Sequence, residues 1–427
     1  MVLTRRGYKE SLKEIIRWLP NEAITEIIQH TSRVDQVALC RVSKLFHGLC
    51  LPVLNRVVHL NELLTASAFL SSLIDNPTRA ESVRSFSVFY FVVAWQVLSR
   101  IYSLYSGRRL ILSPGRFPSN WPEEFSERLL TCLILMLKLE QLSMHPYMMR
   151  THHMRALLEQ RTFPRLLGCD IIPRATPTID SAVPAEDLLA LASFLTCHPT
   201  LTRLRVPSRN RIATSPAVRM ALPNLEYYDG PAYLVPRLVT CRLKGARLWW
   251  QRQDETAVEH IIAALGSLTR PDIPFHYVHE YEGDYYQSIQ LVTQAVATHI
   301  PQTRTVLMRA RQHANYWHRV EEEETIDLVT ACLQARFKPG LVCLALGWCM
   351  VTDGIPAAHQ SDWGTVERWA RACPTLEVCC LNNHVWRKGD DGTWQKFPMM
   401  EFCVLAGVPD PGIDFARSPL AVGFLQP

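Results

Sequence analysis

The sequence predicts an α/β protein in which an N-terminal three-helix module precedes an irregular solenoid with a parallel sheet. The first observation behind this prediction is a series of short amphipathic helical patterns between residues 13 and 60, with apolar side chains three and four positions apart. The second is a leucine-rich hexad that recurs after helical segments from residue 61 onward. Strands that alternate with helices favour parallel pairing and right-handed connections.

The composition is typical of a soluble globular protein. The chain has 427 residues, 48% of them hydrophobic, and a formal net charge of +5, and it contains no long basic run that would favour nucleic acid as a partner. Its 13 cysteines are scattered, odd in number and without a CxxC pair. This pattern favours reduced thiols and therefore a cytoplasmic or nuclear protein over a secreted disulfide framework.

The most apolar stretch, Phe86–Leu98, is shorter than the roughly 20 residues that a membrane-spanning helix needs. Arg84 and Arg100 flank it, and its β-branched and aromatic residues favour a buried strand that runs into a helix. The first ten residues carry charge but no apolar region follows them, so they do not form a signal peptide. We therefore expect no membrane segment.

The N-terminal helical patterns begin at Leu19-Pro20, where proline is tolerated because the first helical N–H has no intrahelical partner. Ser32 and Asp35 have the spacing of a capping box for the next helix. Pro52 is expected to end the last helix before a short strand that reaches Leu60. Two apolar faces result, one from Ile24, Ile27 and Ile28 and one from Val37, Leu39, Val42, Leu45, Phe46 and Leu49.

These residues resemble the F-box family. The family pattern of Leu-Pro-x-Glu, paired aliphatics, Asp, Leu and Val-Ser-Lys before an aromatic is found at Leu19-Pro20-Asn21-Glu22, Ile27-Ile28, Asp35, Leu39 and Val42-Ser43-Lys44-Leu45-Phe46. The stretch that follows, to Leu60, is similar to the exit segment of fungal members. Ala23 and Phe46 depart from the pattern, since a larger aliphatic residue and Trp are usual there. The alternative is an ordinary amphipathic hairpin packed against its own chain.

The resemblance implies a non-catalytic protein that binds a Skp-type adaptor and, through it, a cullin with its ubiquitin-transfer machinery. So small a module has too little core to stand alone, which is a physical reason to expect a partner. Some of the matching positions must be core and others contact surface, and the sequence does not separate them. The positions expected to bind the adaptor are Leu19, Pro20, Ile24, Ile27, Ile28, Leu39, Val42 and Phe46.

The hexads after residue 61 have the spacing LxxLxL, in which positions one, four and six face a core and positions three and five face outward. The clear hexads are 139–144, 201–206, 341–346 and 376–381, and the weaker ones are 166–171, 225–230 and 302–307. The helical segments expected between them are 122–137, 186–196, 256–265, 285–299, 322–335 and 362–372.

Hexad spacing is irregular and no Asn/Cys ladder position recurs, so this region resembles the degenerate leucine-rich-repeat-like domains that follow F-boxes in fungal proteins. An irregular α/β domain without true repeats is the alternative. The expected domains are an F-box at 13–60, a substrate-binding leucine-rich-repeat-like domain at 61–408 and a C-terminal tail at 409–427.

Four arginines are the strongest candidates for contacting a substrate: Arg203, Arg205, Arg209 and Arg211. If the hexad at 201–206 is a strand, the first two share its outward face, where guanidinium groups can bind a carboxylate or phosphate bidentately. This predicts an acidic or phosphorylated partner. The alternative is a solvated strand face.

Other groups with chemical potential favour structural roles. His276 and His279 would turn to opposite faces of a strand, and Cys379 and Cys380 lie in a hexad where thiols pack as small hydrophobic groups. The adjacent pair His152-His153 should diverge on any regular element. The sequence has no phosphate-cradling glycine cluster, so we expect no cofactor, no metal and no catalytic residue.

Together these features predict the substrate-recognition subunit of a Skp–cullin–F-box ubiquitin ligase. The first alternative is a scaffold that uses its F-box outside any ligase, and the second is an enzyme whose site has no sequence signature.

Overall fold

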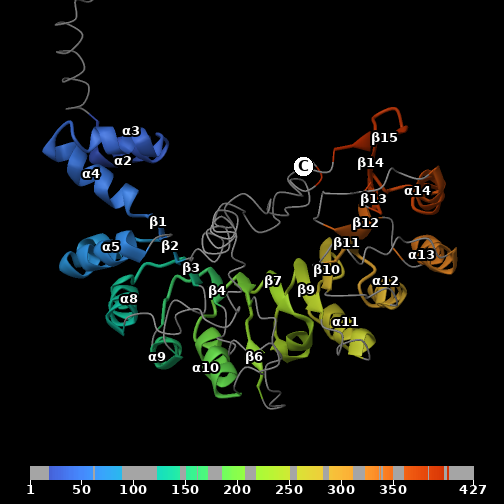
Figure 1. The fold of residues 1–427 in the computed structure, drawn as a ribbon, viewed down its shortest axis with the longest axis horizontal. Coiled ribbons are helices and arrows are strands. Elements are labelled where there is room, and N and C mark those ends of the chain that lie inside the picture. Colours follow the sequence, from blue (N-terminus) through green and yellow to red (C-terminus); the bar gives the residue numbers. More distant parts are fainter. Residues whose placement is uncertain are drawn as a thin grey trace, which may run out of the picture. The chain divides into compact units, whose positions relative to one another are not determined.

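The computed structural model describes residues 19–60, 63–88, 123–144, 151–160, 162–171, 185–206, 218–250, 257–281, 288–310, 323–335, 337, 340–349, 360–382, 384–398 and 402 (Figure 1). The chain forms two compact units, residues 1–166 and residues 167–427.

The first unit begins with the three expected helices, α2 (Asn21–Gln29), α3 (Arg33–Leu39) and α4 (Lys44–Leu54) (Figure 1). Ile24, Ile28 and Cys50 form their buried core. The N-cap of α3 at Ser32 is confirmed, because the Ser32 hydroxyl oxygen accepts from the Asp35 backbone N–H at 3.2 Å, and the hydroxyl donates to the Asp35 carboxylate at 2.6 Å. The Ser43 side chain caps α4 in the same way, accepting from the Phe46 N–H.

The prediction that Pro52 ends the last helix is wrong, since α4 continues to Leu54. Proline cannot donate to the carbonyl four residues earlier, which belongs to Gly48. Both Pro52 and Gly48 are exposed, so water can bind that carbonyl, and the Asn55 amide holds the helix end by donating to the Leu51 oxygen. The loss of one hydrogen bond in the last turn therefore does not stop the helix.

The described residues in the rest of the first unit include three parallel strands with helices between them. The strands β1 (Val57–Leu60), β2 (Ser85–Val88) and β3 (Gln141–Met144) pair in chain order. The helices are α5 (Leu63–Asp75), α6 (Pro77–Glu81), α8 (Glu123–Leu135) and α9 (Thr151–Gln160). The apolar stretch 86–98 reaches β2 with its first three residues, and the remainder lies outside the described residues.

The strands in the sheet of the second unit also follow chain order. From β4 to β13 all neighbours are parallel, and β14 and β15 add an antiparallel hairpin. The strands are β4 (Gly168–Ile171), β5 (Arg203–Arg205), β7 (Tyr227–Pro231), β9 (Gly245–Trp250), β10 (Phe275–Tyr281), β11 (Thr303–Ala310), β12 (Cys343–Cys349), β13 (Val378–Leu381), β14 (His384–Lys388) and β15 (Trp394–Phe397). A separate two-stranded sheet joins β6 (Met220–Ala221) and β8 (Leu238–Val239).

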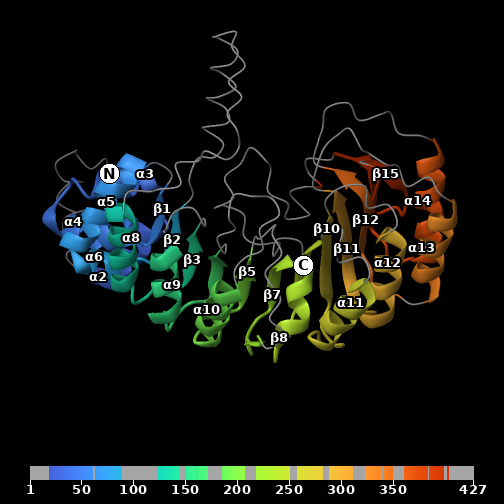
Figure 2. The same cartoon turned by 60° about the horizontal axis from the view of Figure 1, so that its bottom comes forward.

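Helices of the second unit lie along one face of its sheet (Figures 1 and 2). They are α10 (Ala185–Thr196), the 3-10 helix η2 (Ala232–Arg237), α11 (Val258–Ser267), α12 (Ser288–His299), α13 (Glu323–Ala335) and α14 (Gln360–Ala372). None of the helices that the structure describes in this unit lies on the other side, which we call the open face of the sheet. In β5 and its flanks, Leu201, Leu204 and Val206 are buried while Arg203 and Arg205 are half-buried, as the hexad pattern predicts.

The prediction of a mixed α/β fold with N-terminal helices and a parallel sheet is confirmed. The helix expected in each of the six predicted segments is present. Of the helices that the structure describes, none is both long and apolar enough to cross a bilayer.

Candidate protein-interaction surfaces

The N-terminal helices expose large apolar side chains. Among the residues that the structure describes, eleven large hydrophobic side chains are exposed, and six of them lie between residues 19 and 45. Val34 is 79% exposed, Val42 66% and Ile27 54%. The six are Leu19, Ile27, Val34, Val37, Val42 and Leu45, which we call the exposed apolar set. Single exposed apolar residues are normal, whereas a concentration of them marks an interaction site.

The structure separates the eight predicted adaptor-binding positions into three groups. Leu19, Pro20, Ile27 and Val42 are exposed; Ile24 and Ile28 are buried; Leu39 and Phe46 pack against the buried core and are half-buried. Ile24 and Ile28 therefore support the surface from beneath and do not form it.

Sequence reasoning left out three residues of the exposed apolar set, Val34, Val37 and Leu45. The periodic pattern placed Val37 and Leu45 on an apolar face, but that face is wider than the small core it covers. The signal that could have found them is size, because three helices with so few buried residues cannot bury every apolar position.

Hydrogen bonds tie α3 to α2, and Cys50 of α4 packs in their common core. The buried Gln36 side chain on α3 donates to the Ile28 carbonyl at 2.9 Å and to the Thr31 carbonyl at 3.1 Å, which ties α3 to the end of α2. Burial, together with Cys40, raises the pKa of the Cys50 thiol to about 11, so this cysteine is a neutral packing group. The exposed apolar set is therefore presented on a preorganised support.

In the second unit, five charged residues alternate in sign across the open face of the sheet. We call them the charge row: Asp170, Arg205, Asp229, Arg247 and Glu280, contributed by β4, β5, β7, β9 and β10. The first four are direct partners in the register of the parallel strands.

Each arginine of the charge row lies between two carboxylates. Arg205 Nη1 is 3.5 Å from Asp170 Oδ2, and Arg205 Nε is 3.2 Å from Asp229 Oδ2. Arg247 Nη1 is 3.9 Å from the same Asp229 oxygen, and Arg247 Nε donates to Glu280 Oε1 at 2.8 Å. Burial lowers the pKa of Arg247, but the carboxylates of Glu280 and Asp229 outweigh it and raise the pKa above its ordinary value.

Of the four predicted substrate-binding arginines, Arg205 belongs to the charge row and Arg203 lies on the same face one row away. Arg203 pairs in register with Gly168 on one side and Tyr227 on the other. Arg209 and Arg211 lie outside the described residues. The structure thus gives the two described arginines different surroundings on one face.

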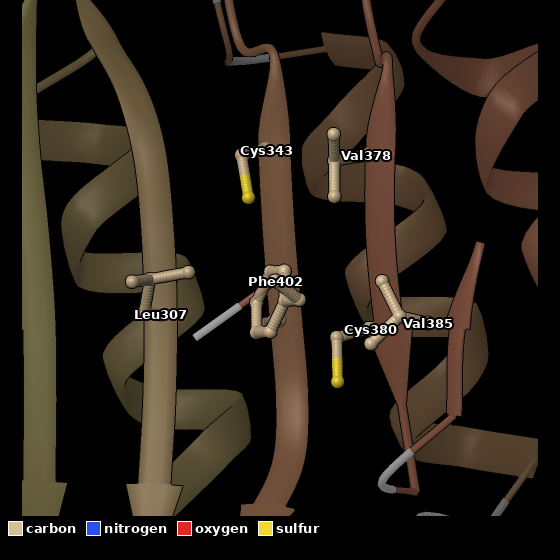
Figure 3. Packing of buried hydrophobic residues seen from close by; sticks show 7 residues of the cluster. Leu307, Cys343, Val378, Cys380, Val385 and Phe402 are labelled. Atoms are coloured by element: carbon tan, nitrogen blue, oxygen red, sulfur yellow. The ribbon is translucent and has the colours of Figure 1, made fainter. Parts of the chain in front are cut away.

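The open face becomes apolar toward the end of the second unit. Leu307, Cys343, Ala345, Val378, Cys380 and Val385, from β11 to β14, pack around the fully buried ring of Phe402 (Figure 3). Partly buried Val278 and Phe397 lie against this group, which we call the aliphatic patch. Burial raises the pKa of Cys343 to about 12, so its thiol is protonated and packs as an apolar group.

Other candidate chemical groups have structural surroundings. His276 pairs in register with Gly245 and His279 with Leu248, so the two side chains point to opposite faces of β10. Burial raises the pKa of Cys379 well above its ordinary value, which leaves a protonated thiol and a poor nucleophile.

One group of described residues could offer three ligands to a metal ion: Glu123, His152 and His153, whose ligand atoms lie within 4.8 Å of one another. The expectation that His152 and His153 diverge is wrong, because their ring centroids are 4.0 Å apart at the start of α9. Glu123 opens α8, and His152 and His153 lie in the first turn of α9. Helix N-termini carry positive partial charge, so this position disfavours a cation.

Residues 16–55 match the F-box domain family. The matched segment includes α2, α3 and α4 and therefore the whole exposed apolar set. A search of curated proteins finds no relative of this chain. The F-box domain implies a role in protein–protein interaction.

Proposed function

We propose that this chain is the substrate-recognition subunit of a Skp–cullin–F-box ubiquitin ligase. F-box domains typically bind Skp-type adaptors, and here the exposed apolar set would form the contact. The observation that carries the proposal is the concentration of six exposed apolar side chains between residues 19 and 45, inside the segment that matches the F-box family. Covering these side chains with a partner removes apolar area from water, which favours association.

The second unit would hold the protein substrate. Its strands follow chain order and its helices share one face, which supports the proposal that it is a leucine-rich-repeat-like solenoid with an open face for binding. Binding at two places on one chain raises the effective concentration of substrate near the transfer machinery. The chain itself would carry out no chemistry.

The test is adaptor binding by the full chain with Ile27→Lys and Val42→Lys combined. Both residues are exposed, so the double variant should keep its thermal stability. A lysine at each position would leave a charge in a dry contact, and the affinity for a purified Skp-type adaptor should fall about 100-fold or more, in line with buried hot-spot positions.

The matched control is Leu189→Lys on α10 of the second unit, where the leucine is 52% exposed. This variant should bind the adaptor as the unchanged chain does. Equal binding by the double variant and the control would contradict the proposal. Adaptor binding without co-purification of a cullin would instead favour a scaffold that acts outside a ligase.

A further inference from the structure

We propose that Arg203, with Tyr227 beside it, is an anion-binding site on the open face of the second unit, and that it recognises a carboxylate or phosphate group on a protein partner. The inference deepens the proposed function and rests on it, because it names the chemistry by which the substrate would be held. Four observations lead to it.

The first observation is that the neighbouring arginine is already neutralised. Arg205 lies two residues along β5 on the same face, and the carboxylates of Asp170 and Asp229 flank it at 3.5 and 3.2 Å. Arg247 is likewise held by Asp229 and Glu280. The charges of both arginines in the charge row are therefore matched by carboxylates of the chain itself.

The second observation is that Arg203 is not satisfied in this way. In the part of the chain that the structure describes, its side chain forms no ion pair and no hydrogen bond. It is half-buried on the sheet and is not a freely solvated surface residue. A partly desolvated guanidinium without a counter-ion gains more from an arriving anion than a fully hydrated one does.

The third observation concerns the space beside Arg203. Its partner in register on β4 is Gly168, which has no side chain, so no β4 side chain lies beside the guanidinium in that row. A carboxylate or phosphate binds an arginine in a bidentate geometry that makes such pairs strong.

The fourth observation is a neutral donor on the other side. Tyr227 is the partner of Arg203 in register on β7. Burial raises the pKa of the Tyr227 phenol, although Lys244 and Arg203 oppose this effect. The phenol is therefore protonated at neutral pH and is a hydrogen-bond donor in the row of Arg203, with its ring against Gly245 of β9.

Together these observations distinguish Arg203 from Arg205 as the residue that meets the ligand. The two arginines are two residues apart along one strand and share one face, yet among the residues that the structure describes only Arg205 has its charge matched. Lys244, which could also serve, is paired with Glu226 at 2.6 Å. The ligand is thus an anionic group on an exposed segment of a partner.

The experiment uses three degenerate peptide libraries that are identical apart from one fixed central residue, which is serine, phosphoserine or glutamate. Retention of each library on the full chain is compared with retention on Arg203→Gln. We expect the full chain to prefer one or both anionic libraries over the serine library. Arg203→Gln should reduce that preference about ten-fold or more, since it removes a charge-assisted pair.

Two further variants sharpen the test. Arg242→Gln removes an exposed arginine elsewhere in the second unit and should leave the preference intact. Arg203→Lys keeps the charge and loses the bidentate geometry, so it should retain part of the preference. It also replaces Arg203→Gln as the test variant if Arg203→Gln folds poorly. Phosphoserine preferred over glutamate identifies a phosphate ligand, and similar retention of both identifies a general carboxylate-type anion.

Equal retention of all three libraries, retention of none, or a preference that persists in Arg203→Gln would each overturn the inference. Failure of the proposed function has a different signature. Arg203→Gln should bind the Skp-type adaptor normally, and the Ile27→Lys, Val42→Lys double variant should keep its library preference. If the unchanged chain does not bind the adaptor, the proposed role of the F-box fails, and the inference about Arg203 is still tested by the libraries.

Discussion

Two histidines on β10 are held in their neutral form by their surroundings. Burial, with a smaller effect of Arg304, lowers the pKa of His276 to about 4. Burial lowers the pKa of His279 to about 3, although Glu280 opposes it. The Tyr277 hydroxyl lies 3.1 Å from His279 Nδ1, and His276 Nδ1 lies 3.2 Å from Thr305 Oγ1. Each neutral ring is part of the packing of the sheet.

We therefore expect the second unit to lose stability as the pH falls from about 6.5 to about 4. In the unfolded chain the histidine pKa is about 6.5, so the unfolded state binds protons in this range while the folded state does not. The free energy of unfolding thus rises with pH, and the stabilisation is complete above pH 6.5 and lost as the pH falls. Each ring contributes on the order of 2 kcal/mol between pH 6.5 and pH 5.

Urea denaturation at several pH values measures this effect. His276→Gln should make the free energy of unfolding less dependent on pH. Between pH 4.5 and 6.5 the number of protons taken up on unfolding should fall by up to one. His260→Gln, which replaces an exposed histidine on α11, should leave the dependence unchanged. Identical pH dependence in both variants would mean that His276 is not held neutral.

For individual residues, the sequence could predict which side chains share a face of a strand but not which other side chains they contact. The alternation of side chains along a strand predicted that Arg203 and Arg205 share one face, and in the structure they do. The carboxylates of Asp170 and Asp229 lie on other strands, and Asp170 is 35 residues from Arg205 in the chain. Such a pair depends on the register of parallel strands, which the intervening helices and loops set and which no local pattern reveals.

Among helices and strands, the elements with strong periodicity were predictable. The four clear hexads all contain or adjoin strands, because three large apolar residues at fixed spacing leave little choice of face. The strand β9 was missed because Ala246 stands where a leucine would complete the hexad that starts at Leu243. The helix α9 was missed because its polar start, with His152 and His153, conceals the apolar side.

The weak hexad at 302–307 was found in the wrong frame. It would turn Leu307 toward the helices, yet Leu307 lies in the aliphatic patch on the open face. Val306 and Met308 instead align with Tyr277 and His279 of β10. An irregularity in the pairing near Phe275 shifts the register at this point, and a shift of one residue exchanges the two faces of a strand.

Among the described residues after β15, Phe402 packs on the sheet. Phe402 is fully buried against the aliphatic patch, and its backbone N–H donates to the Pro398 carbonyl at 3.0 Å (Figure 3). Phe402→Ala should lower the free energy of unfolding of the second unit by about 3–5 kcal/mol, the usual cost of truncating a buried phenylalanine. Urea denaturation of the full chain measures this loss.

Thiol labelling provides an independent measure of the same change. Cys343 and Cys380 lie under Phe402, and peptide mapping after labelling should show faster modification of both in Phe402→Ala. Phe397→Ala, on β15 and only partly buried, is the control and should have a smaller effect on stability and labelling. Equal effects of the two substitutions would contradict a special role for Phe402.

On the scale of the whole molecule, the exposed apolar set and the open face with Arg203 belong to different compact units. The expected domain boundary at residue 60 stays a prediction, and the F-box helices share their unit with β1, β2 and β3. Because the two surfaces lie on separate units, a ligand that binds one surface should stabilise chiefly the unit that carries this surface.

Hydrogen exchange measured with and without a Skp-type adaptor tests this separation. A ligand at 100 times its Kd stabilises the state it binds by about 2.7 kcal/mol, which slows exchange through local opening about 100-fold. We expect that slowing in α2, α3 and α4 and no change in β9, β10 and β11 of the second unit. The Ile27→Lys, Val42→Lys double variant should show no slowing in α2, α3 and α4. Slowing confined to the second unit would contradict docking through the F-box, because a partner protects the backbone of the unit that it covers.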